Sequence, residues 1–355
     1  MSNRLLTISI PTYCRPEYLV ECLDALLISS RSLSKSDLAQ IEVCVFDNSE
    51  DDDRSRLVCE SNRYTPLNLL YKKNMDNIGS DKNILQSLLA PKSRYVAIMS
   101  DDDFVETKYF SHILRTINDF DPDIIFLKAY GLTGKNDLIR PLNFSKNKIF
   151  TSPIPLLFDR LIQVGFVSTA VYRRDKIDDS VVQDSVGTNL VQVGACFSVM
   201  ANMSSAIYSG ENMVKVTRNN SGGYSPILVF YTKFFQIMQK FNYYGMSERQ
   251  FFRFKNKMLL VFYSRNFAQH FRAAGKGLFG DEKEILDDAF LGNNSYRFLI
   301  RKLFIMNNTF SYMMLSLIFV LANVVYYPGR FFDFLNHIVN YSIKKISNLL
   351  IKSKK

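Results

Sequence analysis

Apolar runs of strand length alternate with segments of helical spacing over the first 130 residues, and this alternation restricts the fold more than any other feature. Strands are predicted over residues 5–10, 41–46, 67–71, 95–99 and 124–127. Helices are predicted to begin near residues 16, 52, 80 and 107, where apolar side chains recur every three or four positions. This pattern is typical of an α/β protein with a Rossmann-like, doubly wound and mostly parallel sheet. In such a sheet the ligand lies beyond the carboxyl ends of the strands.

Polar side chains gather at that edge of the predicted sheet. The first strand leads into residues 11–15, the second ends at Asp47, the third precedes residues 74–83, and the fourth runs into the aspartates 101–103. Three adjacent carboxylates repel one another, so a chain that keeps them pairs them with a cation or uses them to cap a helix. Helix caps explain one or two such clusters. Four clusters at one edge favour a ligand site.

Four segments in this region resemble a known family. In order along the chain they read ISIPTYCRPEYLVECLDALL, VCVFDNSEDDD, NMDNIGSDKNILQSLL and YVAIMSDDDF. Their order and spacing resemble a family 2 glycosyltransferase with the GT-A fold, of the bacterial O-antigen and capsule type that includes the abequosyltransferase-like group. The resemblance implies a nucleotide-diphosphate sugar as donor and Mn²⁺ or Mg²⁺ as cofactor, since these ions suit carboxylate and phosphate oxygens. A nucleotidyltransferase on a related fold is disfavoured, because no glycine-rich phosphate loop with a lysine or arginine follows the first strand.

The resemblance also implies roles for single residues. The acid that ligates the metal corresponds to Asp103, and the acid near the ribose and the metal's waters corresponds to Asp101. Asp47 corresponds to the aspartate that reads the base, although the sequence after it departs from the family's pattern and an Asx-turn is the alternative. Lys82 either reaches a phosphate or is an ordinary exposed helix lysine. The full set of implied nucleotide-sugar contacts is Pro11, Thr12, Tyr13, Arg15, Asp47, Gly79, Lys82, Asp101 and Asp102.

The catalytic base is harder to identify, because the Glu-Asp pair usual in the second half of the family is missing. Inverting transfer by direct displacement needs a carboxylate that accepts the proton of the acceptor hydroxyl. We predict Asp184 for this role, with Asp178 and Asp179 as alternatives, and a surface loop acid is the competing interpretation of Asp184. Residues 218–224 either close over the diphosphate or form a simple glycine turn.

The C-terminal part of the chain is basic and apolar. Residues 297–355 contain nine basic side chains and one acid, so +8 of the net charge of +10 lies there. Charge beside apolar sequence favours an anionic membrane surface, and not nucleic acid, as a partner. Residues 311–327 carry no charge and are marginal in length for a span, while residues 341–355 have the pattern of an interfacial amphipathic helix. We therefore expect in-plane or hairpin attachment, with a true span or a buried soluble helix as alternatives.

These observations predict a GT-A domain over residues 1–225, a helical extension over 226–296 and membrane-associating helices over 297–355. The expected protein is an inverting, metal-dependent glycosyltransferase of bacterial surface polysaccharide synthesis. Its acceptor would be a polyprenyl-diphosphate-linked saccharide, and its location the cytoplasmic face of the inner membrane, as a peripheral or monotopic protein. A catalytically inactive member that acts as a membrane-bound assembly module is the alternative. The oligomeric state is left open.

Overall fold

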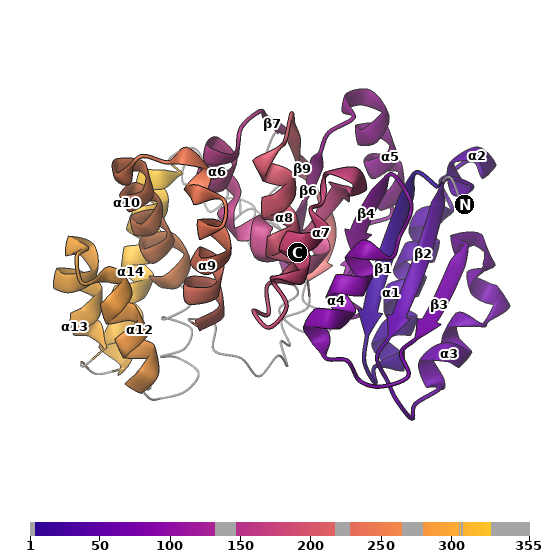
Figure 1. The fold of residues 1–355 in the computed structure, drawn as a ribbon, viewed down its shortest axis with the longest axis horizontal. Coiled ribbons are helices and arrows are strands. Elements are labelled where there is room, and N and C mark those ends of the chain that lie inside the picture. Colours follow the sequence, from indigo (N-terminus) through magenta and orange to yellow (C-terminus); the bar gives the residue numbers. More distant parts are fainter. Residues whose placement is uncertain are drawn as a thin grey trace, which may run out of the picture. The chain divides into compact units, whose positions relative to one another are not determined.

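The computed structural model describes residues 4–131, 147–216, 228–264, 280–304, 306 and 308–327. The chain divides into two compact units, residues 1–244 and 245–355 (Figure 1). Residues 218–224 and 341–355, for which a loop and an amphipathic helix are predicted, lie outside the described residues.

The first unit is built on one mixed sheet with the strand order β3-β2-β1-β4-β8-β6-β9-β5, and β7 pairs with β9. The strands are β1 Leu6–Thr12, β2 Ile41–Asp47, β3 Leu69–Lys73, β4 Tyr95–Ile98, β5 Phe104–Val105, β6 Ile124–Gly131, β7 Lys148–Phe150, β8 Ala170–Arg173 and β9 Ala206–Val216. The four strands β3, β2, β1 and β4 are parallel, as the alternation predicts. Beyond them β8 lies antiparallel between β4 and β6, while β6 and β9 pair in parallel, so the sheet as a whole is mixed.

Strand β1 continues through Pro11 to Thr12, whereas the sequence predicted that the proline would close it. The pairing of β1 with β4 ends at Ser9, so from that point β1 pairs with β2 alone. A proline, which has no backbone N–H, is tolerated where one side of a strand has no partner. The extra residues place Thr12 opposite Asp47 in the register, at the edge of the sheet where the polar clusters are expected.

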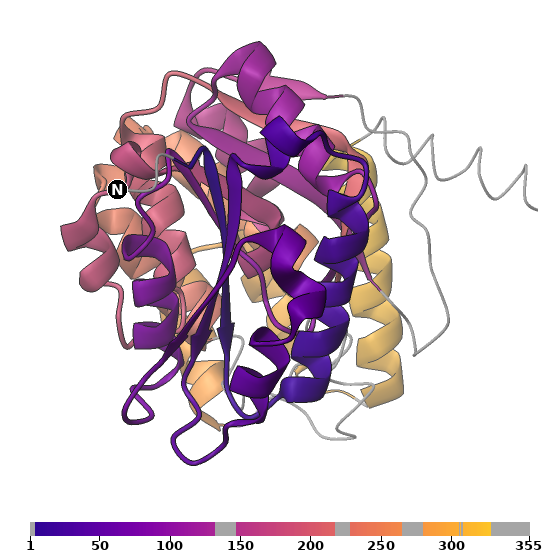
Figure 2. The ribbon, with the colours of Figure 1, turned by 90° about the vertical axis from the view of Figure 1, so that its right-hand side faces the viewer.

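Helices cover both sides of the parallel strands (Figure 2). The longer described helices of the first unit are α1 Pro16–Ser30, α4 Ser80–Leu89, α5 Tyr109–Phe120, α6 Pro153–Gly165 and α8 Val191–Ala201. Its shorter described helices are α2 Lys35–Leu38, α3 Arg54–Cys59, η1 Asn62–Leu67, η2 Val167–Thr169, η3 Arg174–Lys176, α7 Asp179–Gln183, η4 Leu228–Lys233, α9 Phe234–Gln239 and η5 Asn242–Gly245. Helix α1 contacts α3 and α5, whereas α4 contacts α7 and α8. The predicted apolar positions of α1, Leu19, Cys22, Leu23 and Leu26, are buried in the core.

The described part of the second unit is helical. Its elements are α10 Glu248–Lys257, η6 Met258–Tyr263, α12 Gly280–Phe290, η7 Tyr296–Ile300, α13 Arg301–Leu303 and α14 Asn308–Tyr326. Arg301 donates two hydrogen bonds to Asp287, at 2.8 and 2.9 Å, and so joins α13 to α12. The boundary predicted after residue 296 therefore falls inside this unit, and the one predicted after residue 225 lies outside the described residues.

Candidate active site

The aspartate triplet lies directly after β4, and the end of β1 supplies its nearest partners. Thr12 Oγ1 donates a hydrogen bond of 2.7 Å to Asp101 Oδ2. The Arg15 guanidinium lies 3.4 Å from Asp101 Oδ1 and 3.7 Å from Asp102 Oδ2. Four of the residues predicted for the site thus meet, because parallel strands β1 and β4 end at the same edge of the sheet.

Asp103, the predicted metal ligand, is held from the other side by a residue that the sequence did not reveal. Ser168 Oγ donates to Asp103 Oδ2 at 2.6 Å and accepts the backbone N–H of Ser100 at 2.9 Å. Ser168 belongs to η2, which precedes β8, and β8 is inserted next to β4. A lone serine before a strand has no local signature, so only the antiparallel pairing of β8 identifies it.

Burial makes the ionised form of Asp101 costly. The residue is 4% exposed, and this desolvation raises its pKa to about 6, while the hydrogen bond from Thr12 and the charge of Arg15 act in the opposite direction. A cation beside such a carboxylate offsets the cost of its charge. Asp103 is also buried, at 6% exposure.

The carboxylates fit a divalent ion that is shared with a phosphate ligand. Within the described residues, no group of three or more His, Cys, Asp and Glu side chains is arranged to hold a metal ion by itself. Mg²⁺ is usually bound by one or two carboxylates, and substrate phosphates and waters complete its shell. Asp101 and Asp103 offer two such carboxylates, so they are the residues that would hold the ion.

Asp47 is fully buried, and both of its carboxylate oxygens already have partners inside the protein. Tyr71 OH donates to Oδ2 at 2.7 Å, and Ser49 donates its hydroxyl and its backbone N–H to Oδ1 at 2.6 and 2.9 Å. This is the Asx-turn given as the alternative for Asp47. Because Asp47 has no exposed surface, a nucleobase would reach this carboxylate only after the side chains around it moved.

Asparagine side chains tie together the loops at this edge of the sheet. Asn48 donates to Asn77 Oδ1 at 2.6 Å and accepts from the Ile78 backbone N–H and from Asn74 Nδ2, both at 3.0 Å. Asn77 Oδ1 also accepts the Gly79 N–H at 3.0 Å. These bonds hold Gly79 at a φ of 84°, a left-handed conformation that favours glycine.

The other predicted nucleotide contacts differ in exposure. Tyr13 is 51% exposed and Lys82 lies on the exposed side of α4, so both are accessible to a ligand. Pro11 lies within β1 and is partly buried. The geometry is compatible with a contact from Tyr13 and Lys82, and their roles stay predictions.

The three acids proposed as catalytic base lie in or beside α7. Asp178 accepts the Ser180 hydroxyl at 2.6 Å and also caps this helix by accepting the backbone N–H groups of Ser180 and Val181, and these bonds lower its pKa. Asp179 pairs with Arg174 at 2.9 Å. Asp184 follows the helix with its side chain 68% exposed and lies 3.0 Å from the Lys240 ammonium. Asp178 and Asp179 therefore have structural partners of their own. Asp184 likewise has a partner in Lys240, all three acids are exposed, and the role of Asp184 stays a prediction.

Asp81, in the first turn of α4, is bound to the loop that follows Asp184. Its Oδ2 accepts the backbone N–H groups of Gly187 and Asn189, at 2.7 and 3.0 Å. Both loop residues have positive φ angles, 88° and 59°. The first turn of α4 thus anchors the loop between α7 and α8, and a separation of 106 residues left no local sequence signal for this contact.

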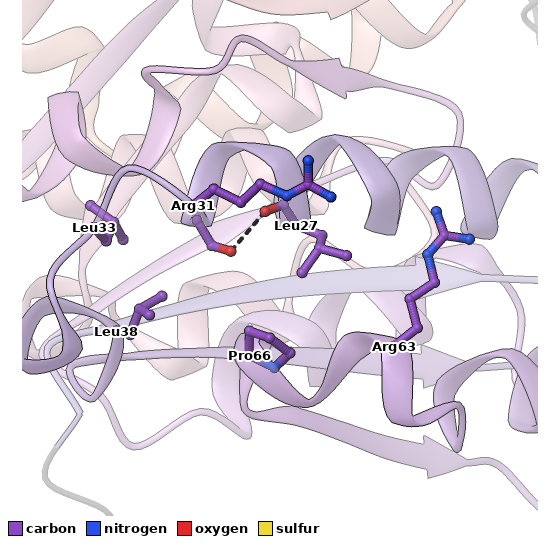
Figure 3. A pocket seen from close by; sticks show the side chains of 7 residues that line it. Leu27, Arg31, Leu33, Leu38, Arg63 and Pro66 are labelled. Carbon is purple, nitrogen blue, oxygen red and sulfur yellow. Dashed lines mark hydrogen bonds between the residues drawn. The ribbon is translucent and has the colours of Figure 1, made fainter.

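A separate open pocket of 420 Å³ lies at the other end of α1 (Figure 3). It is lined by Leu27, Ser30, Arg31, Leu33, Leu38, Arg63 and Pro66. Arg15 precedes the first turn of α1, whereas Leu27, Ser30 and Arg31 belong to its last turn and end, a distance of about 20 Å along the helix. The pocket is therefore not part of the aspartate site.

Comparisons with known proteins agree with this geometry. Residues 7–180 match the family Glycosyl transferase family 2. The abequosyltransferase RfbV of Salmonella typhimurium is 32% identical over 120 residues, which are 34% of this chain and 34% of that protein, so the similarity spans about a third of the relative. The S. aureus TarS 1–349 structure is similar with a TM-score of 0.55 and 16% identity, over 90% of this chain and 91% of that one. The same protein in complex with UDP has a TM-score of 0.54 at 15% identity.

At such low identity the similarity to TarS concerns the fold alone. The family match covers the four parallel strands, the aspartate triplet and Ser168. Residues 7–180 of this chain therefore form a family 2 glycosyltransferase domain with the GT-A fold.

Proposed function

We propose that the chain is an inverting, metal-dependent glycosyltransferase that moves a hexosyl or deoxyhexosyl group from a nucleotide-diphosphate donor to a saccharide acceptor. The observation that carries the proposal is the aspartate triplet after β4, held by Thr12, Arg15 and Ser168 inside a family 2 domain. Buried carboxylates such as Asp101 and Asp103 are costly unless hydrogen-bond donors or a cation compensate their charge, and a bound metal ion would do so here.

We infer how the nucleotide-sugar donor would bind from the charged side chains at this edge of the sheet. Asp103 and Asp101 would hold Mn²⁺ or Mg²⁺, which when bound offsets the charge that the leaving diphosphate gains. Arg15 is half-exposed beside these acids and supplies a second positive charge for the diphosphate. Tyr13 offers an exposed ring for the base, and the Asn48 network holds Gly79 where its backbone is open to a ligand. TarS has been crystallised with UDP and UDP-GlcNAc, which makes UDP the first nucleotide to test here.

We propose that the saccharide acceptor binds near the loop that follows α7. Asp184 would accept the proton of the acceptor hydroxyl as the sugar transfers with inversion. Asp81 supports this arrangement, because it fixes the following loop to the first turn of α4. The similarity to an abequosyltransferase, together with the basic apolar C-terminal part, supports a polyprenyl-diphosphate-linked O-antigen or capsule intermediate as acceptor. The location would be the cytoplasmic face of the bacterial inner membrane.

A catalytically inactive assembly module is the second candidate. The observation that favours it is Asp184 itself, which is exposed and paired with Lys240 and so has no special environment for a base. Turnover of any nucleotide sugar by the purified protein would exclude this candidate.

The test compares nucleotide binding with and without Mn²⁺. Thermal unfolding is followed with a panel of nucleoside diphosphates, for the wild type, for Asp103→Ala and for the control Asp119→Ala, an exposed aspartate of α5. We expect one nucleotide to raise the unfolding temperature of the wild type and the control only when Mn²⁺ is present, and to have no effect on Asp103→Ala. Transfer should stop in EDTA. Full activity of Asp103→Ala, or full activity in EDTA, would refute the metal assignment.

A further inference from the structure

Helix α14 exposes a continuous apolar face. The outward residues recur at intervals of three and four, as one side of a helix does, and are 44–74% exposed. They are Phe310, Met313, Leu317, Val320, Leu321 and Val325. A face of this kind on a 19-residue helix is larger than the single exposed leucines that soluble proteins tolerate. It therefore needs a partner.

Three polar side chains of α14 have hydrogen-bond acceptors inside the protein. Ser316 donates to the Tyr312 carbonyl at 2.7 Å, and Asn323 donates to the Phe319 carbonyl at 2.8 Å, each one turn back in the same helix. Ser311, which is fully buried, donates to the Leu303 carbonyl. Such internal bonds reduce the desolvation cost of these groups in an apolar surrounding.

The other side of α14 is packed against its own unit. Leu315, Ile318 and Ala322 are buried, and the end of the helix contacts polar groups of α10. Asn256 donates to Tyr326 OH at 3.2 Å, and the Lys257 ammonium lies 5.6 Å from the centre of the Tyr326 ring. A helix that crossed a bilayer surrounded by lipid would have to give up these contacts. The structure therefore favours a helix that meets lipid on one side only.

Basic side chains accompany the apolar face. Arg297 and Lys302 are exposed in the segment before α14, beside the exposed Phe298 and Leu299. In the sequence after residue 327 there are six basic residues and one acid. Cations on both sides of an uncharged apolar helix complement a surface of anionic lipid.

We propose that α14 lies in the plane of an anionic membrane, with its outer face in the acyl region and its inner face packed on its own unit. This deepens the membrane attachment proposed above, because it assigns a part of the attachment to a folded apolar face in addition to the basic tail. At about 1.5 Å per residue the helix is about 28 Å long, so a span is marginal by length as well. The inference does not depend on which sugar or nucleotide the enzyme uses.

Because the chain contains no tryptophan, single tryptophans can report the depth of α14. Phe310→Trp, Leu317→Trp and Val325→Trp are placed on the outer face of the full-length protein, and Leu57→Trp, at an exposed leucine of α3, is the control. Equimolar phosphatidylglycerol and phosphatidylcholine vesicles are added, and emission and quenching by brominated lipids are measured. We expect all three outer-face probes to shift to the blue and to be quenched at one common, shallow depth, while the emission of the Leu57→Trp control does not change.

The other outcomes overturn the proposal. A deep probe at 317 with shallow probes at 310 and 325 would mean that the helix spans the bilayer. A probe at 317 that is already protected from aqueous quenchers without lipid would mean that another segment or a second copy covers the face. No shift at any probe would exclude the membrane as the partner.

Vesicle sedimentation gives a second measurement. Burying one leucine side chain changes an affinity by roughly ten- to a hundredfold, so Leu317→Glu should weaken binding by at least about tenfold, and Leu57→Glu should have no effect. Unchanged binding of Leu317→Glu would contradict the proposal. Nucleotide-induced thermal stabilisation is measured on the same samples. If no nucleotide stabilises the wild-type protein, the proposed catalytic function fails, and the vesicle-binding result still stands on its own.

Discussion

Replacing Asp101 by asparagine tests whether this site carries a stability cost. Burial raises the pKa of Asp101 from 3.8 to about 6 in the folded protein. Between these values the folded state binds the proton and the unfolded chain releases it, so stability falls as pH rises through this range. A difference of about 2 pKa units corresponds to about 3 kcal/mol, and the full cost is present above pH ~6.

Asparagine keeps the shape of the side chain and cannot ionise. Thr12 can still donate to its amide oxygen, while the ion pair with Arg15 is lost. We expect Asp101→Asn to be more stable than the wild type near pH 8 by up to about 3 kcal/mol, since the raised pKa of Asp101 already includes the attraction of Arg15. Near pH 4 the advantage should fall below about 1 kcal/mol, because the wild-type carboxyl is then largely neutral in the folded state.

Urea unfolding in EDTA at a series of pH values measures the difference. Asp178→Asn is the control of opposite sign, because the pKa of Asp178 is lowered by the hydrogen bond from the Ser180 hydroxyl and by its helix-capping hydrogen bonds. That variant should be less stable than the wild type at neutral pH, and its deficit should shrink as the pH falls. A difference between Asp101→Asn and the wild type that does not vary with pH would refute the reasoning, since Arg15 would then compensate the Asp101 charge completely.

Three further predictions concern Asp47, Asp184 and the C-terminal tail. Asp47→Ala leaves Tyr71 OH without its acceptor, so urea unfolding should show a loss of about 1–3 kcal/mol, and nucleotide affinity should fall roughly ten- to a hundredfold if Asp47 also reads the base. Asp184→Asn should lower the transfer rate by about 10²–10⁴-fold with little change in nucleotide binding, and a near wild-type rate would exclude it as base. Deleting residues 342–355, which lie outside the described part, should weaken vesicle binding and make the remainder less sensitive to salt, since each lysine contributes about 1 kcal/mol that salt screens. Unfolding of the truncated protein would contradict that prediction.

Periodicity and strand order in the sequence were enough to predict which residues of the first 103 gather at one edge of the sheet. Apolar alternation determines where β1, β2, β3 and β4 lie, and parallel strands bring their carboxyl ends to one edge. Thr12, Arg15 and the aspartates therefore meet as predicted. The sequence also indicated the apolar character of α14, because residues 311–327 carry no charge.

The tertiary structure decided which distant residues hold the site and which faces are covered. The antiparallel insertion of β8 brings Ser168 to Asp103, and the packing of α4 brings Asp81 to Gly187. The tertiary structure also showed that Asp47 is fully buried and accepts a hydrogen bond from the Tyr71 hydroxyl. Such pairings depend on which surfaces pack together, and local propensity carries no information about partners 65 or 106 residues away. The same reason explains α14, where the chain's own packing selects the side of an apolar helix that stays exposed.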